Sequence, residues 1–499
     1  MSAANDQLST PEVRRRAVTG AVVDAFRGSG VKVVGLVGTL VTARLLSPYD
    51  FGLVAIGTTV LAFGSFLDDG GVGTALIRRP EPPTKRELQA LVAFQFSIDL
   101  IMVLVIALVM LPFGLVGQVT TVIVISLPAG AFRAPAYILY ERRLNFRPMA
   151  VVEITETCAY YVWAIGTILI GWGVWGLATA YAVRAFTGLA LLLILSPEGR
   201  VRPVPSWSKV RPMLSFGVRY QAVGLAHMVR DQGVNVALAT FGGVAVLGLW
   251  GVAWRILQLP ISLFQALWRV SFPGMSRLVA ANEEVGGTIE RVIAVVAIGT
   301  GLLVAPLAAS SSAWIHVLLG AQWGAAASAI PPACFAMMFG VPISVALSGY
   351  LWAIGSASVP LRATIIGIPA AMVILLPLLP FIGVAAAGLA YVGSAAVESV
   401  FFIHASRQTT KFKVGARLMV PVVLATVSGT CGWVVERLIG PDLAGALASS
   451  AVAVGVFVGG LAAIHRADLA DAWALVGRGL RGAVARSADA GPAPEPATG

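Results

Sequence analysis

The chain has 499 residues, of which 58% are hydrophobic and only 12% are charged. Soluble domains carry charges at about a quarter of their positions, so two or three soluble domains of this total length would lack charged surface. The composition therefore excludes a soluble enzyme, a disordered chain and a disulfide scaffold, and it indicates a polytopic membrane protein. The formal net charge of +11 is interpreted through membrane topology rather than as a nucleic-acid surface.

Fourteen apolar stretches are long enough to be transmembrane helices, because a helix needs about 20 mostly apolar residues to cross the hydrocarbon core. In chain order the predicted spans are 18–46, 50–70, 88–111, 119–140, 150–170, 173–196, 213–240, 244–268, 289–310, 324–350, 361–380, 383–404, 414–436 and 442–464. Residues 465–499 are expected to form an amphipathic helix and a disordered end. The predicted fold class is an all-α polytopic membrane protein.

The basic residues are distributed unequally between the two sets of connections. Of 35 Lys and Arg residues, 27 fall in one set together with the termini, two fall in the alternate set and six lie within the spans. By the positive-inside rule both termini are cytoplasmic, which requires an even number of spans. We therefore expect a multi-pass protein whose N-terminus (1–17) and tail (465–499) lie in the cytoplasm.

Two short motifs recur along the chain. The motif Asp50–Leu53 opens the second span and Val246–Leu249 opens the eighth, an offset of 196 residues, while Gly-Leu-Ala recurs from Gly176 to Gly388, an offset of 212. The pattern predicts two copies of a six-helix unit, the second with about sixteen extra residues near His316. The expected domains are an N-lobe (18–196), a cytoplasmic linker (197–212), a C-lobe (213–404) and two appended spans (405–464). Parallel repeats of this kind leave a central cavity, as in transporters.

Five segments resemble motifs of a known family. They are Ala43–Val54 (ARLLSPYDFGLV), Asp69–Arg79 (DGGVGTALIRR), Tyr140–Arg147 (YERRLNFR), Gly171–Leu177 (GWGVWGL) and Phe272–Arg277 (FPGMSR). In this order they are similar to segments of bacterial polysaccharide exporters, the polysaccharide transport family of the multidrug/oligosaccharidyl-lipid/polysaccharide exporter superfamily. The resemblance covers about residues 15 to 415, and it departs from the family pattern at the Phe241–Val244 turn.

This resemblance implies a fold of two pseudo-symmetric six-helix lobes in a V, alternating between inward and outward openings. It implies a flippase of the bacterial inner membrane, not an enzyme, which moves undecaprenyl-diphosphate-linked oligosaccharide from the cytoplasmic to the outer leaflet. The expected partners are this lipid-linked oligosaccharide, membrane lipids, and the polymerase and glycosyltransferases of the same pathway. No nucleic acid is expected.

Two rival functions stay open. A multidrug cation antiporter of the same superfamily would need acidic groups in its cavity, and a membrane-embedded polysaccharide polymerase would need a large outer loop with catalytic side chains. The spans hold more basic than acidic residues, and the predicted outer loops are short. The sequence has no GxxxxGK[ST] motif, so we expect no ATP hydrolysis by a P-loop mechanism, and energy from an ion gradient, the membrane potential or removal of the product outside. No cofactor and no metal are expected.

Six basic residues lie within the predicted spans, where each costs roughly 2.5–3.5 kcal/mol at a helix centre. They are Lys32, Arg133, Arg184, Arg219, Arg230 and Arg255. In a two-lobe repeat the first, seventh and eighth spans face the cavity, so four of these groups are expected to converge there: Lys32, Arg219, Arg230 and Arg255. Guanidinium groups bind phosphate oxygens in a bidentate way, and the hypothesis is that these four hold the lipid diphosphate.

The other charges are interpreted as coupling groups or as structural pairs. They are Asp68, Asp99, Arg133, Arg184, Asp231 and Glu398. Within the first lobe, Asp99 is the expected partner of Arg133 or Arg184. On the fifth span, Glu153 and Glu156 are expected either to carry coupling protons or sodium, or to pair at the interface with Arg78, Arg142 and their neighbours.

The remaining acids have two interpretations each. Asp231 is expected to satisfy Arg219 or Arg255. Asp68 is expected either to carry a coupling ion or to pair with a nearby arginine at the membrane interface. Glu398 is a lone acid in an apolar run, which makes it the proton-relay candidate of the second lobe.

Overall fold

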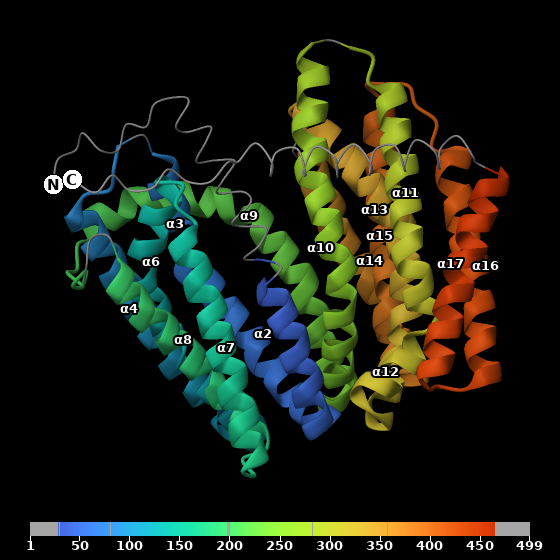
Figure 1. The fold of residues 1–499 in the computed structure, drawn as a ribbon. Helices are drawn as coiled ribbons and strands as arrows, with labels where there is room; N and C mark the ends of the chain where they lie inside the picture. Colours follow the sequence, from blue (N-terminus) through green and yellow to red (C-terminus); the bar gives the residue numbers. More distant parts are fainter. Residues whose placement is uncertain are drawn as a thin grey trace, which may run out of the picture. The chain divides into compact units, whose positions relative to one another are not determined.

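The structure is a computed structural model, and it describes residues 28, 30–79, 81–196, 200–281, 283–356 and 358–464. These residues form helices joined by short connections, and no strand occurs among them (Figure 1). Ten segments in these ranges are long and apolar enough to cross a membrane. One of them, Lys85–Arg142, has 58 residues and includes two of the expected spans. The chain is therefore an all-α, multi-pass membrane protein.

The helices follow one another with few residues between them. A helix over residues 30–45 comes first. It is followed by α2 (Pro48–Asp69), α3 (Val72–Arg78), α4 (Lys85–Met110), η2 (Leu111–Phe113), α5 (Gly114–Val124), α6 (Leu127–Arg142), α7 (Arg147–Leu169), α8 (Val174–Leu195), α9 (Trp207–Ala237) and the π-helical turn η3 (Leu238–Gly242). The chain continues with α10 (Val244–Ala280), α11 (Gly286–Ala309), α12 (Ser311–Leu319), η4 (Ala321–Ala329), α13 (Ile330–Ala353), α14 (Ser358–Ile382), α15 (Ala385–Arg407), α16 (Gly415–Ile439) and α17 (Leu443–Ile464).

The contacts group the chain into two compact units, each treated separately below. Unit 1 comprises Met1–Arg255, Leu318–Ala326 and Leu375–Ala387. Unit 2 comprises Ile256–Val317, Ala327–Ile374 and Gly388–Gly499. The predicted N-terminal segment (1–17) and tail (465–499) lie outside the described residues. The helix α9 and the first part of α10 group with unit 1.

The family-like motifs supply the signals that begin and end α2. Ser47 caps the helix through a capping box with Asp50, and Pro48 stands in the first turn, where a missing N–H costs nothing. The helix ends at Gly70, which adopts a left-handed conformation with φ of 48° that a glycine accommodates without strain. These residues therefore fix both ends of α2.

The start of α4 is organised in the same way by Glu87. Thr84 caps the helix through a capping box with Glu87. Both oxygens of Glu87 also accept hydrogen bonds from the Arg79 guanidinium, each 2.9 Å long. The hydrogen bonds that Arg79 donates to Glu87 raise the pKa of Arg79. This bidentate pair ties the connection after α3 to the first turn of α4.

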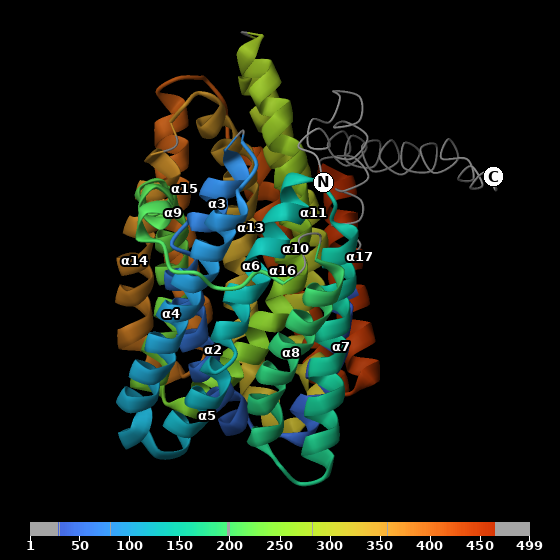
Figure 2. The ribbon, with the colours of Figure 1, turned by 90° about the vertical axis from the view of Figure 1, so that its left-hand side faces the viewer.

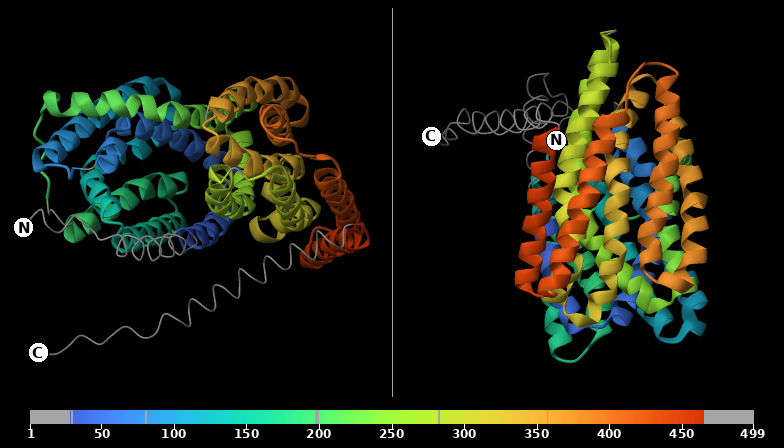
Figure 3. Two further views of the ribbon diagram at one scale, coloured as in Figure 1. Left: turned by 90° about the horizontal axis from the view of Figure 1, so that it is seen from above. Right: turned by 90° about the vertical axis from the view of Figure 1, so that its right-hand side faces the viewer.

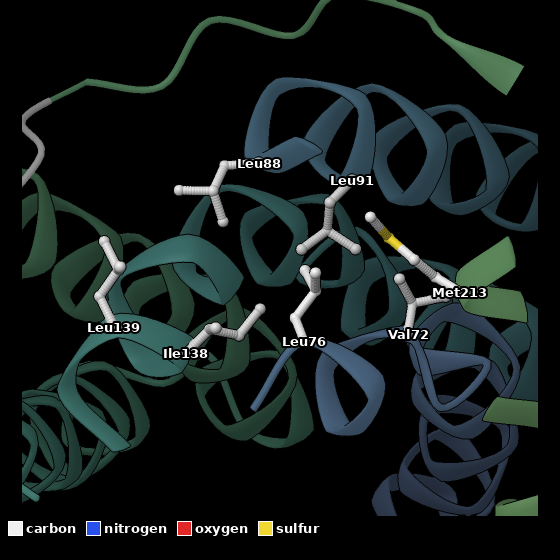
Figure 4. Packing of buried hydrophobic residues seen from close by; sticks show 7 residues of the cluster. All are labelled: Val72, Leu76, Leu88, Leu91, Ile138, Leu139 and Met213. Carbon is white, nitrogen blue, oxygen red and sulfur yellow. The ribbon is translucent and has the colours of Figure 1, made fainter. Parts of the chain in front are cut away.

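An apolar cluster packs four helices of unit 1 together near the α2–α3 turn (Figure 4). Its buried members are Val72, Leu76, Leu88, Leu91, Ile138, Leu139 and Met213, from α3, α4, α6 and α9. Elsewhere in this unit α7 and α8 run side by side (Figure 2). These contacts fix the helices that carry most of the buried charges described below.

Unit 2 is built around α11, which contacts α13, α16 and α17. The helices α16 and α17, coloured orange-red to red, lie side by side (Figure 3). A Cβ atom on Gly301 of α11 would lie 2.1 Å from the Phe457 ring of α17, so a glycine is required there. Small residues at helix contacts allow the close packing that membrane helices depend on.

Two glycines mark the crossing of α2 and α10 in unit 1. A Cβ atom on Gly52 would lie 1.9 Å from the carbonyl oxygen of Val244, and one on Gly248 would lie 1.9 Å from the carbonyl oxygen of Pro48. Pro48 and Val244 are 196 residues apart, as are the two glycines. The offset found in the sequence therefore relates residues that make equivalent contacts.

Candidate functional site

Arg255 is the central basic residue of the candidate site in unit 1. Its Nη1 donates to Thr39 Oγ1 over 2.7 Å, and its Cζ lies 5.7 Å from the centre of the Phe51 ring. The side chain is exposed, and it forms no ion pair with a described carboxylate. The cation is thus held by a neutral hydroxyl and an aromatic ring, which leaves guanidinium donors for a ligand.

Three tyrosines support the Thr39–Arg255 contact from behind. The Tyr161 hydroxyl lies 3.1 Å from Thr39 Oγ1, and its ring fills the place where a Cβ on Gly38 would stand, 2.1 Å away. Tyr160 packs edge-to-face between Tyr161 and Tyr181, with ring-centre distances of 4.8 and 5.1 Å. The glycine on the helix over residues 30–45 therefore admits an aromatic layer contributed by α7 and α8.

A cavity of about 160 Å³ opens beside Arg255 within unit 1. Its lining combines the Phe51 and Trp254 rings with the polar side chains of Thr58 and Asn235. Such a mixture of apolar walls and a few polar groups is typical of small-molecule sites. The site as a whole is basic and aromatic, and it has no acidic residue in the described lining.

Three charges elsewhere in unit 1 gather around one buried carboxylate and form a group that we call the triad: Arg133, Glu156 and Arg184. Glu156 is 3% exposed, and its two oxygens lie 2.7 Å from Arg133 Nη2 and 3.3 Å from Arg184 Nε. Gly188 makes room for it, because a Cβ there would lie 2.1 Å from Glu156 Oε2. With two cations and one anion, the triad keeps a net charge of +1 inside the membrane protein.

A second cavity of unit 1, about 450 Å³, adjoins the triad. Its polar lining includes Asp68, Gln95 and Arg133. One helical turn beyond Gln95 on α4 stands Asp99, which is fully buried and whose oxygens accept no hydrogen bond from a described residue. An unpaired buried carboxyl is costly, and ionisable groups placed in this way in membranes mark functional positions.

The four residues assigned from sequence to the diphosphate have different surroundings. Arg255 occupies the site just described, and Lys32 is exposed two helical turns before Thr39 on the same face. Arg230 forms an ion pair with the adjacent Asp231, 2.9 Å apart. The side chain of Arg219 lies outside the described residues. The helix over residues 30–45 therefore carries both Lys32 and Thr39, the residue that accepts the hydrogen bond of Arg255.

Two pairings expected from the sequence are wrong. Asp99 does not neutralise Arg133 or Arg184, because both arginines bind Glu156 instead. Glu156 in turn is not the interfacial partner of Arg142, since it points into the triad. The Arg142 guanidinium donates instead to backbone carbonyl oxygens at the end of α3.

Two further acids each contact a residue close by in the chain. Asp231 binds Arg230, its neighbour in the chain, rather than Arg255. Its predicted pairing with Arg219 stays a prediction, because the Arg219 side chain lies outside the described residues. Glu398, on α15 of unit 2, accepts a hydrogen bond of 3.3 Å from Ser394, one turn away. Its relay role stays a prediction.

The triad has a signal in the sequence that a count of charges overlooks. Glu156 and Arg184 each stand fourteen residues from Ile170, at the turn that joins α7 to the antiparallel α8. Trp163 and Thr179 are nearly equidistant from the same turn, and they share a hydrogen bond of 3.0 Å. Counting outward from the Gly-Trp-Gly turn therefore identifies the partner of Arg184.

Comparison with known proteins gives a consistent set of relatives. A family model described as "Polysaccharide biosynthesis protein" matches residues 41–328. The chain is 25% identical over 333 residues to the succinoglycan biosynthesis transport protein ExoT of Rhizobium meliloti (strain 1021), covering 63% of this chain and 65% of that protein. It is 22% identical over 330 residues to the lipopolysaccharide biosynthesis protein WzxC of Escherichia coli (strain K12), covering 62% and 65%. The match thus spans just under two thirds of each relative.

Solved structures show the same fold at low sequence identity. The lipid II flippase MurJ in an inward closed conformation aligns with a TM-score of 0.70 and 13% identity, covering 90% of this chain and 99% of that one. An inward-facing multidrug resistance MATE family transporter aligns with a TM-score of 0.56 and 16% identity, covering 76% and 94%. The family model matches more than half of the sequence, and the helical fold agrees with it. The chain therefore belongs to the polysaccharide biosynthesis protein family.

Proposed function

We propose that the chain is a flippase for lipid-linked oligosaccharide. It moves an undecaprenyl-diphosphate-linked polysaccharide precursor from the cytoplasmic to the outer leaflet of the bacterial inner membrane by alternating access, and it catalyses no covalent step. In this proposal fourteen spans form two six-helix lobes in a V with two appended helices, and both termini are cytoplasmic. Membership of a family with flippase and transport relatives supports it.

The observation that carries the proposal is the neutral support of Arg255. A diphosphate brings about two negative charges, and a guanidinium that is not already bound to a carboxylate binds phosphate oxygens in a bidentate way. Thr39 and Phe51 hold Arg255 without neutralising it. Lys32, exposed on the same helix face as Thr39, adds a second cation for the same headgroup.

The surroundings of Arg255 suit the uncharged part of the substrate. Sugar rings present both apolar faces and hydroxyl groups, and the adjacent cavity presents the Trp254 ring together with Thr58 and Asn235. Such a cargo needs no charged partner beyond the diphosphate. A multidrug cation carrier would need the opposite sign of charge at Arg255.

Translocation needs an energy source and a supply of substrate. The sequence has no P-loop motif, so the proposal assigns the energy to an ion gradient, the membrane potential, or removal of the product on the outer side. Glycosyltransferases of the same pathway supply the lipid-linked oligosaccharide, and a polymerase consumes it.

Replacing Arg255 tests the proposal most directly. In cells that depend on this chain for polymer export, Arg255→Ala is expected to lower export about tenfold or more, because a charge-assisted bond to the diphosphate is lost. Arg255→Lys keeps the charge but not the bidentate geometry, and an intermediate rate is expected. Arg362→Ala removes an exposed arginine of α14 and serves as the matched control. Undiminished export by Arg255→Ala at normal protein level contradicts the proposal.

A further inference from the structure

A segment that comprises the end of α12 and most of η4 belongs to unit 1, although the helices on either side of it belong to unit 2. We call this segment, Leu318–Ala326, the strap. It falls in the connection near His316, where the second sequence copy has about sixteen extra residues. The corresponding connection of the first copy, between α4 and α5, holds only the three-residue turn η2. The strap is thus a feature of one copy alone.

Four hydrogen bonds fasten the strap to the end of the helix over residues 30–45. Arg44 Nε donates to the Leu318 carbonyl (2.8 Å), and Trp323 Nε1 donates to the Ala43 carbonyl (2.8 Å). Gln322 Nε2 donates to the carbonyls of Ala43 and Leu46 (3.1 and 3.2 Å). The last carbonyls of a helix have no partner within it, so the strap satisfies groups that the helix itself leaves open.

Trp323 connects this cap to the groups that hold Arg255. Its side chain is fully buried, and its ring packs edge-to-face on Phe51 at 5.0 Å. Phe51 is the ring beneath the Arg255 guanidinium, and Thr39, which accepts the Arg255 hydrogen bond, stands one turn before Ala43. Trp323 therefore contacts both of the elements that orient Arg255.

The strap lies beside the place where α2 and α10 cross without space between them. Gly52 stands against the Val244 carbonyl and Gly248 against the Pro48 carbonyl, so the two backbones touch at the starts of both helices. Because Ser47 and Pro48 follow the capped helix end directly, a movement of α2 away from α10 at this crossing must displace the strap's binding surface.

We propose that the strap is a latch for this end of the transport path, with Trp323 as its positioning residue. The inference rests on the proposed function, in which the start of α2 lies on the outer side of the membrane. While bound, the strap keeps α2 against α10. Through Phe51 and the helix that carries Thr39, it also keeps Arg255 oriented. Its release from Ala43 and Leu46 lets the two helices separate, and the site then opens outward.

The first test measures outer-side access, which needs no substrate. In a chain whose three native cysteines are replaced, Thr58→Cys places a thiol in the cavity beside Arg255. Trp323→Phe keeps a ring against Phe51 but removes the N–H donor, so labelling by a membrane-impermeant maleimide from outside is expected to rise about fivefold. Trp314→Phe removes another indole donor, bound to Ser450 at 3.4 Å, and is the matched control.

Equal labelling rates in Trp323→Phe and in the parent chain overturn the latch. A fold-wide loosening is distinguished from latch release because it raises labelling in Trp314→Phe as well, and that result also overturns the proposal. Since the assay involves no cargo, its outcome decides for or against the latch even where the proposed substrate is wrong.

The second test locks the strap. Arg44→Cys and Leu318→Cys are both at exposed positions, and a short bifunctional thiol reagent joins them. Cross-linking is expected to stop polymer export, and cleavage of the linker to restore it. The same treatment of Trp163→Cys with Thr179→Cys, whose native side chains meet across α7 and α8, is expected to leave export unchanged. Full export by the strap-locked chain overturns the latch, whereas absence of export in the untreated parent counts against the proposed function only.

Discussion

The interiors of the two units differ in the kind of polar group they bury. Unit 1 buries Asp68, Glu87, Asp99 and Glu156, whereas Glu436 is the buried charged side chain among the described residues of unit 2. The polar groups inside unit 2 are mostly hydroxyls that bond to their own helix, as Thr300 does to the Val296 carbonyl at 2.7 Å. The two units therefore differ in their interiors: unit 1 encloses several charged side chains, whereas unit 2 encloses mostly hydroxyls and apolar side chains.

This difference has an energetic meaning. A charge inside a membrane bundle is tolerated only with a partner or a role, while a hydroxyl bonded one turn back costs little. Changes to charged side chains in unit 1 should therefore be far more damaging than matched changes in unit 2. Three predictions follow from the largest expected effect to the smallest; the first and the last test this contrast, and the second tests the equivalence of the two sequence copies within unit 1.

The largest effect is expected at the centre of the triad. Glu156→Ala leaves the largely buried Arg133 and the partly exposed Arg184 without their anion, and removing one partner of a buried pair costs about 3–5 kcal/mol. Thermal unfolding in detergent measures the loss as a lower melting temperature. Glu398→Ala, which removes a partly exposed glutamate of unit 2, is expected to cost about 1 kcal/mol or less.

The triad experiment has an informative extension. Replacing all three charges by Leu or Met is expected to recover much of the stability lost in Glu156→Ala, because no unpaired charge then remains. Equal melting temperatures for Glu156→Ala and Glu398→Ala break the contrast between the units.

An intermediate effect is expected at the α2–α10 crossing, where the two sequence copies behave alike. Gly52→Ala and Gly248→Ala each force a methyl group onto a backbone carbonyl, and overpacking of this kind costs about 1–3 kcal/mol. The two variants should lose similar amounts of stability. Gly251→Ala, with no atom near its added methyl, should be neutral or slightly stabilising. A large effect at only one of the two glycines contradicts the equivalence.

The smallest effect is expected from single hydroxyls. Thr39→Val removes the acceptor of Arg255 and the partner of Tyr161, and the expected loss of stability is about 1 kcal/mol. Thr300→Val removes a hydroxyl that bonds only to its own helix in unit 2, and it should change the melting temperature little. Indistinguishable melting curves for these two variants show that the Thr39 contact adds nothing.

The membrane class and many helix limits could be predicted because they depend on local sequence. Ser47 and Pro48 start α2, Gly70 ends it, and the apolar length between them suits a span. The repeat offset of 196 was also visible, since each copy needs a glycine at the same crossing. These features depend on residues that are neighbours in the chain or on the spacing between repeated residues.

The partners of the buried charges could not be found by counting charges. Asp99 and Glu156 are both acids in apolar helices, and which one meets Arg133 depends on how each helix is rotated. The strap is harder still, because Trp323 and Ala43 are 280 residues apart and share no pattern. Composition revealed that the charges exist, and only the packing reveals what they touch.

In the α7–α8 hairpin, the number of residues that separate a side chain from the turn determines which residue of the other helix it meets. Glu156 meets Arg184, and Trp163 meets Thr179, because each pair is nearly equidistant from the Gly-Trp-Gly corner. Deleting one residue from that corner would rotate α8 by about 100° and separate each of these residues from its partner on α7. For anyone engineering this protein, that corner is therefore the wrong place for an epitope tag or a fluorescent insertion, however exposed it looks.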